Sequence, residues 1–330
     1  MMNELIAAFP QQLREAVEIT KNTFIKPIST PVKNIMVTGL GGSGMGANMV
    51  YDLLNSQLHI PFMVNKDYVL PASVGVGTLV IASSYSGNTE ETLAAFEQAR
   101  QRGAHIVCIT SGGKLAQLAQ QYQCDIAFMP AGKPSPRACL GYSLVQQLHV
   151  LAALGFAKPQ ILDAIVVAAN WLDGQTPQIQ TEAQNLANGL IRKIPVIYAP
   201  AHAESVAIRW RQQINENSKM LAWHHVIPEM NHNELVGWRI FNDQLGVVFF
   251  ELEDTHPRTA LRMQLNRELI SQYTPHIFRV QAKGVSLLQR ILYLTCLGDW
   301  LSWYLAQLRG VDAMGENVID QLKNALGKVN

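Results

Sequence analysis

The sequence lacks most features that mark secreted, membrane-bound and nucleic-acid-binding proteins. Its four cysteines form no C-x-x-C pair and indicate no disulfide framework, so a reducing cytoplasm is the simplest setting. Residues 1–20 are amphipathic and carry scattered charges, unlike a signal peptide, and no apolar run approaches the length of a membrane span. A net charge of +1 gives no reason to expect nucleic acid or an acidic membrane as a partner. We therefore predict a soluble cytoplasmic protein.

Apolar residues are abundant instead. They make up 48% of the 330 residues, while charged residues make up only 15%. This balance is typical of a compact globular protein with large buried surfaces, and the length leaves room for two domains. The low content of charge also favours an oligomer, in which part of the surface is buried.

Short apolar segments alternate with helical segments through most of the chain. The predicted strands are 34–38, 61–65, 78–83, 105–110 and 125–129, then 195–199, 246–251 and 276–280. Such alternation is typical of parallel sheets with helices on both faces and ligands at the carboxyl ends of the strands. A mainly helical stretch separates the two halves. We predict an α/β fold of two doubly wound parallel-sheet domains, residues 1–155 with a leading helix and residues 156–330 with linker helices.

The most informative stretch is residues 83–92, Ser-Ser-Tyr-Ser-Gly-Asn-Thr-Glu-Glu-Thr, between a buried strand and a helix. Free backbone N–H groups and the positive end of the helix dipole meet at such a turn. Its hydroxyls can donate to phosphate oxygens without adding charge, so a phosphate monoester is the expected ligand. The alternative is that Ser86 or Thr89 only caps the helix, with a glutamate following as in a capping box. One hydroxyl would be enough for that role.

A glycine-rich turn, residues 39–46, follows the first strand and contains G-x-G-x-x-G before a helix. This is the fingerprint of dinucleotide-binding proteins, which also requires an acidic residue at the end of the next strand. That strand ends in Asn65-Lys66, with Asp67 just beyond. The alternative is that the glycines let a sugar phosphate lie close to the backbone, with Ser43 adding a hydroxyl. A second phosphate-type turn two strands later favours one small phosphorylated ligand.

Arg137 and Glu216 are candidates for chemistry on that ligand. Arg137 follows two prolines that stiffen a loop after the fifth strand, and it could stabilise an anionic ligand or a developing oxyanion. Glu216 lies between Asn215 and Asn217 where a helix is predicted to end, and a carboxylate held in this way can be oriented for proton abstraction. The alternatives are a surface arginine that caps a helix and a solvated glutamate.

His232 lies in the polar loop 228–234 and could transfer protons near neutral pH, although a lone loop histidine is more often inert. Nearby histidines and glutamates raise the question of a metal site. The residues concerned are His224, His225, Glu229, His232 and Glu234. Their spacings fit neither H-x-x-x-H nor H-E-x-x-H, so we expect no metal.

Together these motifs resemble the bifunctional phosphoglucose/phosphomannose isomerases, which are built from two sugar isomerase (SIS) domains. The motifs are Gly41–Gly44, Ser84–Thr89, Pro136-Arg137, Asn215–Asn217 and Asn231–Glu234, in the order of the family. The serine turn alone marks only the SIS superfamily, whereas the Asn-Glu-Asn and Asn-His-Asn-Glu pair is more specific. The resemblance spans residues from about 30 to the end, and it implies two SIS-type three-layer α/β/α domains.

The resemblance implies an aldose–ketose isomerase that interconverts glucose 6-phosphate and/or mannose 6-phosphate with fructose 6-phosphate through a cis-enediol(ate). Neither a metal nor a redox cofactor takes part in such a reaction. The implied phosphate-binding residues are Gly42, Ser43, Ser84, Ser86 and Thr89. Glu216 would move the proton between C1 and C2, and Arg137 would stabilise the enediolate oxygens.

The resemblance also implies a homodimer. His232 would open the sugar ring in the site of the other subunit, and Lys323 would assist ring opening. Two departures from the family occur. Ser135 replaces a polar amide, and residues 312–317 lack the Pro-Thr-Pro type sequence, whose threonine is thought to help admit both epimers.

Two competing functions follow from parts of the same pattern. An NAD-dependent dehydrogenase would rest on the glycine-rich turn, but the missing acidic residue after the second strand and the second phosphate-type turn count against it. A non-catalytic SIS-type sensor of sugar phosphates would need the serine turn but would have no use for Glu216 or His232.

Overall fold

The computed structural model describes residues 1–328, which form two compact units. The N-terminal unit comprises Ala7–Gln175 with Val285–Leu292, and the C-terminal unit comprises Met1–Ile6, Thr176–Gly284 and the segment from Tyr293 on. The division falls inside the long helix α7 (Ile161–Leu190). The domain boundary expected between residues 155 and 156 therefore stays a prediction. None of the described helices is long and apolar enough to cross a membrane.

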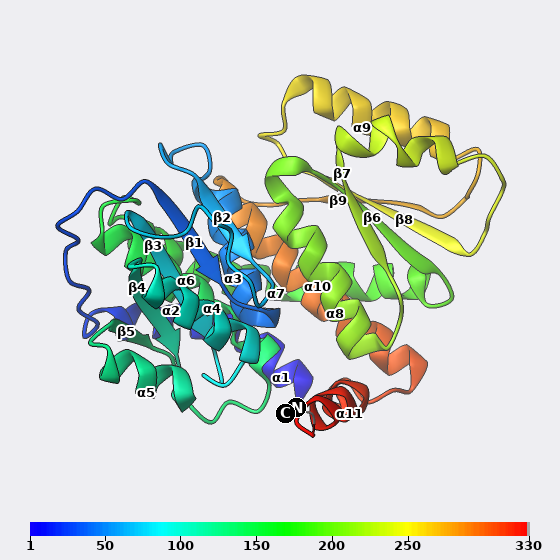
Figure 1. The fold of residues 1–330 in the computed structure, drawn as a ribbon. Coiled ribbons are helices and arrows are strands. Elements are labelled where there is room, and N and C mark those ends of the chain that lie inside the picture. Colours follow the sequence, from blue (N-terminus) through cyan, green and yellow to red (C-terminus); the bar gives the residue numbers. More distant parts are fainter. Residues whose placement is uncertain (329–330) are drawn as a thin grey trace. The chain divides into compact units, whose positions relative to one another are not determined.

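The N-terminal unit contains a five-stranded, fully parallel sheet in the order β2-β1-β3-β4-β5 (Figure 1). The strands are β1 (Asn34–Thr38), β2 (Phe62–Asn65), β3 (Thr78–Ser84), β4 (His105–Thr110) and β5 (Asp125–Phe128). The helices are α2 (Phe9–Thr20), α3 (Gly41–Leu54), α4 (Glu90–Gln101), α5 (Gly113–Gln121) and α6 (Leu140–Ala153), with a 3₁₀ turn η1 (Pro136–Cys139). Chain order reverses between β1 and β3, and this crevice is where doubly wound sheets bind ligands.

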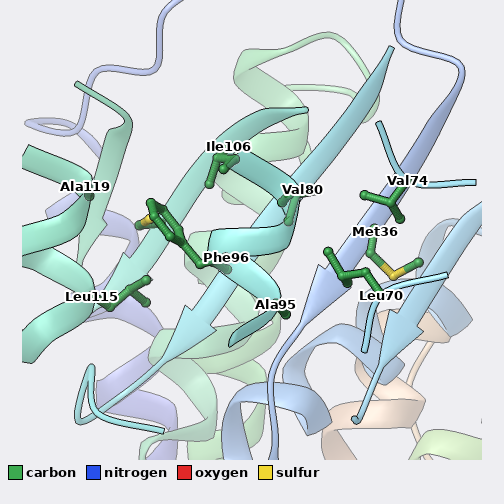
Figure 2. Packing of buried hydrophobic residues seen from close by; sticks show 12 residues of the cluster. Met36, Leu70, Val74, Val80, Ala95, Phe96, Ile106, Leu115 and Ala119 are labelled. Carbon is green, nitrogen blue, oxygen red and sulfur yellow. The ribbon is translucent and has the colours of Figure 1, made fainter. Parts of the chain in front are cut away.

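Helices cover both faces of this sheet, which is why its central strand β3 is buried at every position. On one face, Phe96 of α4 and Leu115 of α5 pack against Val80 and Ile106 in the apolar cluster of Figure 2. Helices α3 and α6 pack together on the other face. Continuous apolar runs such as Thr78–Ala82 are what a strand buried on both faces requires.

The C-terminal unit repeats the pattern with four parallel strands in the order β7-β6-β8-β9 (Figure 1). The strands are β6 (Ile194–Pro200), β7 (Trp223–Ile227), β8 (Leu245–Glu251) and β9 (Ile277–Gln281). The helices are α8 (Glu204–Ser218), α9 (Pro257–Ile270), α10 (Leu287–Arg309) and α11 (Asn317–Leu326); helix α1 (Met2–Ala7) starts the chain. Phe249 lies in a cluster with Met263 of α9, and the next residue, Phe250, packs on Trp210 of α8. The predicted α/β fold of two doubly wound parallel sheets is confirmed. Strand β7 and helix α11 were not predicted.

Candidate active site

The glycine-rich turn brings the start of α3 against the segment that carries Arg137. Gly41 adopts a φ of +52°, which favours glycine. A Cβ on Gly42 would lie 3.0 Å from the carbonyl oxygen of Pro136, and one on Gly44 would lie 2.3 Å from that of Gly39. Close packing of backbone segments is therefore enough to require glycine at these positions, and a bound dinucleotide is not needed to explain them. Ser43 is the third residue of α3 and is buried.

Hydroxyls hold the serine turn in its shape. The oxygens Ser84 Oγ and Thr89 Oγ1 lie 2.8 Å apart, and the Gly87 N–H donates to Ser84 Oγ at 3.1 Å. Gly87 has a φ of +69°, and a Cβ there would lie 1.9 Å from the carbonyl oxygen of Gly112. Thr89 is the N-cap residue of α4 but makes no side-chain cap hydrogen bond. Side-chain capping thus does not explain Thr89. The first N–H groups of a helix such as α4 are of the kind that bind an anion.

Tyr85 ties the serine turn to the loop that leads to Arg137. Its hydroxyl donates to the carbonyl oxygen of Pro130 at 2.9 Å and accepts from the N–H of Lys133 at 2.9 Å. Burial raises the pKa of Tyr85 to about 12, so the phenol keeps its proton at neutral pH.

The two turns and Arg137 lie at one edge of the sheet. A Cβ on Gly39 would lie 2.7 Å from the carbonyl oxygen of Ser83, so the ends of β1 and β3 are in close contact. Arg137 is 5% exposed, and its Cα lies 3.6 Å from the position of a Cβ on Gly42. The N-terminal unit therefore gathers the predicted phosphate-binding residues and Arg137 at its topological switch point. Ser86 is the exposed member of the set.

Glu216 lies in the last turn of α8 between two asparagines whose side chains are both hydrogen-bonded. Asn215 Nδ2 donates to the carbonyl oxygen of Met220 at 2.7 Å, and Asn217 Nδ2 donates to Ser302 Oγ of α10 at 2.9 Å. Lys219 ends the helix with a φ of +55°, and its Nζ donates to the Glu216 carbonyl oxygen. The residues on either side thus fix the backbone from which the Glu216 carboxylate extends.

Glu216 borders a pocket of about 680 Å³. The other residues that line it come from the end of α8 and from the segment before and within α11: Asn215, Lys219, Leu221, Asp312, Gly315, Glu316, Asn317, Val318 and Ile319. Residues 312–317, which depart from the family sequence, therefore contribute to the same pocket as Glu216, the predicted base.

Helix α8 is fixed by its contacts with α10. Arg209 donates from Nε and Nη2 to the two oxygens of Asp299 at 2.9 and 2.8 Å, and both side chains are buried. Trp210 Nε1 donates to the carbonyl oxygen of Leu294 at 2.7 Å. A Cβ on Gly298 would lie 2.2 Å from the Trp210 ring, so α10 needs a glycine where the indole crosses it.

His232 and Lys323 lie elsewhere in the C-terminal unit. His232 ends the 3₁₀ turn η3 (Glu229–His232) and is exposed, and Lys323 is exposed on α11. Neither is among the residues that line the Glu216 pocket.

A group of side chains around Glu234 was not predicted. Its carboxylate contacts Tyr198 of β6 and both Trp223 and His225 of β7. The only signal in the sequence was the alternation that puts Trp223 and His225 on one face of a strand. Among residues 1–328 no group of three or more His, Cys, Asp or Glu side chains is placed to hold a metal ion.

Known proteins are similar to both halves of the chain. A family model described as the bacterial phospho-glucose isomerase C-terminal SIS domain matches residues 179–326, and the SIS domain model matches residues 30–156. The bifunctional phosphoglucose/phosphomannose isomerase of Caldicellulosiruptor bescii is 39% identical over 339 aligned residues, which cover 99% of each chain. The protein of the same name from Aquifex aeolicus is 37% identical, with 91% of this chain and 92% of that relative covered.

A solved structure gives the same fold. The C-terminal domain of glucosamine-fructose-6-phosphate aminotransferase from Francisella tularensis aligns with a TM-score of 0.76 at 14% identity. The alignment covers 94% of this chain and 97% of that one. At this identity the likeness shows the SIS fold alone.

Proposed function

Because the chain belongs to the family of bifunctional phosphoglucose/phosphomannose isomerases, we propose that it interconverts glucose 6-phosphate and mannose 6-phosphate with fructose 6-phosphate. The observation that carries this proposal is Glu216, a carboxylate at a pocket of about 680 Å³ whose neighbouring asparagines are both hydrogen-bonded. Moving a proton between a carbonyl carbon and the carbon next to it requires one base in a fixed position. A protein that only senses sugar phosphates would have no use for it.

The residues divide the work of this reaction. The backbone at Gly42 and the hydroxyls of the two turns, Ser43, Ser84, Ser86 and Thr89, bind the phosphate. In the open-chain sugar, Glu216 takes the proton from C1 or C2 and returns it to the other carbon, while a hydroxyl proton moves between O1 and O2. The enediolate that forms in between carries negative charge, which the guanidinium of Arg137 stabilises. Return of the proton to either face of C2 gives the glucose or the mannose epimer.

Ring opening requires an acid–base group of its own, and we assign it to His232 of the other subunit in a homodimer, assisted by Lys323. His232 is exposed and does not line the Glu216 pocket of its own chain. The segment that follows it exposes Val236 at 61%, Ile240 at 83% and Phe241 at 64%. Apolar side chains gathered in this way are typical of a surface covered by a partner.

The setting we propose is the cytoplasm. All four cysteines are free thiols, which suits a reducing compartment.

The first experiment is turnover of fructose 6-phosphate by the purified, EDTA-treated protein, with glucose and mannose 6-phosphates separated. Glu216→Gln should lose at least about a hundredfold in kcat, because a positioned general base contributes at least that factor. Its binding of fructose 6-phosphate, measured by calorimetry, should persist.

The matched control is Glu268→Gln, which alters an exposed glutamate of α9 and should leave turnover unchanged. Binding without turnover in the unmodified protein would favour the sensor. Full activity of Glu216→Gln would contradict the assignment of Glu216 as the base.

A further inference from the structure

The carboxylate of Glu234, two residues after His232, is a hub for three hydrogen bonds. Its Oε1 accepts from the Tyr198 hydroxyl at 2.5 Å and from Trp223 Nε1 at 3.2 Å. Its Oε2 lies 2.8 Å from His225 Nδ1. The side chain is about one-quarter exposed, so these bonds are partly shielded from water.

The donors to this hub are themselves fixed by the sheet. Tyr198 of β6 and His225 of β7 are direct partners across the two strands. Tyr198 is fully buried, and its hydroxyl accepts from Trp238 Nε1 at 3.0 Å. Burial and the hydrogen bond to Glu234 raise the pKa of Tyr198, which keeps it a donor. The position of Glu234 is therefore set by two strands of the core.

The rest of the turn is held as well. Met230 is buried in the apolar core, and Asn231 Nδ2 donates to Asn266 Oδ1 of α9 at 2.8 Å. Asn233 Nδ2 donates to Glu229 Oε1 at 2.9 Å, and Asn233 Oδ1 accepts from the N–H of Glu234. Among the described residues, none makes a hydrogen bond or ion pair with the exposed His232 ring. Every other side chain from Glu229 to Glu234 is hydrogen-bonded or buried, so the ring of His232 is the exposed group that this fixed turn carries.

We infer that Glu234 is a positioning residue for ring opening, which acts by fixing the turn 229–234 against Tyr198, Trp223 and His225 so that His232 is presented in one geometry. The inference rests on the proposed function, in which His232 exchanges protons with the sugar ring. An acid–base group must lie within hydrogen-bond reach of its target, and a displacement of about 1 Å can cost about a hundredfold in rate.

The test compares two substrates, one that closes into a ring and one that stays open. Fructose 6-phosphate closes through its C5 hydroxyl. 5-Deoxyfructose 6-phosphate has no hydroxyl at C5 and a phosphate on C6, so it cannot form the furanose ring. Loss of ring opening should slow only the first substrate. A general weakening of the fold would slow both.

Glu234→Gln keeps the shape of the side chain, but its amide nitrogen donates where the carboxylate accepts. We expect kcat/KM for fructose 6-phosphate to fall at least about tenfold, while the value for the 5-deoxy analogue stays within about twofold. Tyr198→Phe removes one donor to Glu234. It should also lower kcat/KM for fructose 6-phosphate relative to that for the 5-deoxy analogue, but by a smaller factor. Circular dichroism melting identifies any variant that fails to fold, and Glu268→Gln is the neutral control.

His232→Asn provides the reference. If Glu234 acts through His232, the double variant Glu234→Gln/His232→Asn should have the same kcat/KM for fructose 6-phosphate as His232→Asn alone, since the two changes affect one function. Equal loss on both substrates, or additive losses in the double variant, would overturn the inference. Absence of fructose 6-phosphate turnover in the unmodified protein would instead remove the proposed function, so the two failures are distinguishable.

Discussion

At the scale of single residues, the proposed phosphate-binding edge depends on residues that do not contact the phosphate in our assignment. Tyr85 is one of them, because its hydroxyl joins the serine turn to the loop that leads to Arg137. Gly87 is another, because a side chain there would collide with the backbone at Gly112. Such residues fix the shape of the proposed site, whose assigned binding groups are backbone N–H groups and short hydroxyls.

Tyr85 makes the stability of the folded state depend on pH in the alkaline range. Its pKa is raised to about 12 from about 10, so the folded state binds this proton more tightly than the unfolded state. The contribution is present in full below about pH 10 and is lost as the pH rises toward about 12. Urea unfolding between pH 9 and 12 should show a smaller loss of stability for Tyr85→Phe than for the unmodified protein. Equal losses would mean that the phenol titrates normally. Comparing the two proteins removes the effect of the other buried tyrosines.

At the scale of helices and strands, the position of Glu216 depends on how α8 packs on α10. The buried Arg209–Asp299 pair and the Trp210 indole over Gly298 set the register of the two helices. The proposed base then lies at the end of a helix that these contacts fix against α10, and Asn217, next to it, adds a hydrogen bond to Ser302.

Gly298→Ala tests this packing. The new methyl group would lie 2.2 Å from the indole, and overpacking of this kind costs about 1–3 kcal/mol. We expect a lower free energy of unfolding in urea and a lower kcat, since α8 must shift. The control is Gly174→Ala in α7, where an added Cβ meets nothing within 4 Å. That change should be neutral or slightly stabilising, as alanine is the better helix former. Unchanged stability and kcat in Gly298→Ala would show that α8 tolerates the shift.

The elements found from the sequence are those with one dominant signal. Strand β3 was predicted within a residue because its apolar run is continuous, as burial on both faces demands. Strand β7 was missed because Trp-His-His-Val-Ile, a half-buried edge strand, has two adjacent histidines and so shows neither a continuous apolar run nor a strict alternation. Helix α11 was missed, and its start lacks a side-chain cap hydrogen bond at Glu316.

The residues of the candidate site also differ in how far they could be predicted from the sequence. Turns such as residues 83–92 could be identified because their chemistry is local to a strand end and a helix start. The partners of Glu234 could not, because Tyr198, Trp223 and His225 are brought together only by the pairing of β6 with β7. Long-range pairing is not encoded in any one stretch of the sequence.

At the scale of the whole molecule, membership of the isomerase family confirms the resemblance seen in five short motifs. Both halves of the chain match SIS domain models, and both sheets place their first strand next to the third. The N-terminal unit carries the candidate phosphate site, and the C-terminal unit carries Glu216 and His232. In the proposed assignment, one architecture used twice supplies the binding groups in one copy and acid–base groups in the other.

A shared site makes a prediction that a self-contained subunit does not. If His232 serves the site of the other subunit, Glu216→Gln and His232→Asn dimers are each defective at both sites. Mixing the two variants under mild denaturation and refolding them gives half heterodimers, and each heterodimer holds one complete site. Activity on fructose 6-phosphate should then recover to about one quarter of the unmodified level, as expected for a symmetric dimer that assorts at random. Sedimentation equilibrium should give a dimer before and after mixing. Recovery fails in a protein whose sites lie within single chains, because each chain would keep its own defect. The same mixing with Glu268→Gln in place of Glu216→Gln is the control, since those chains supply both groups.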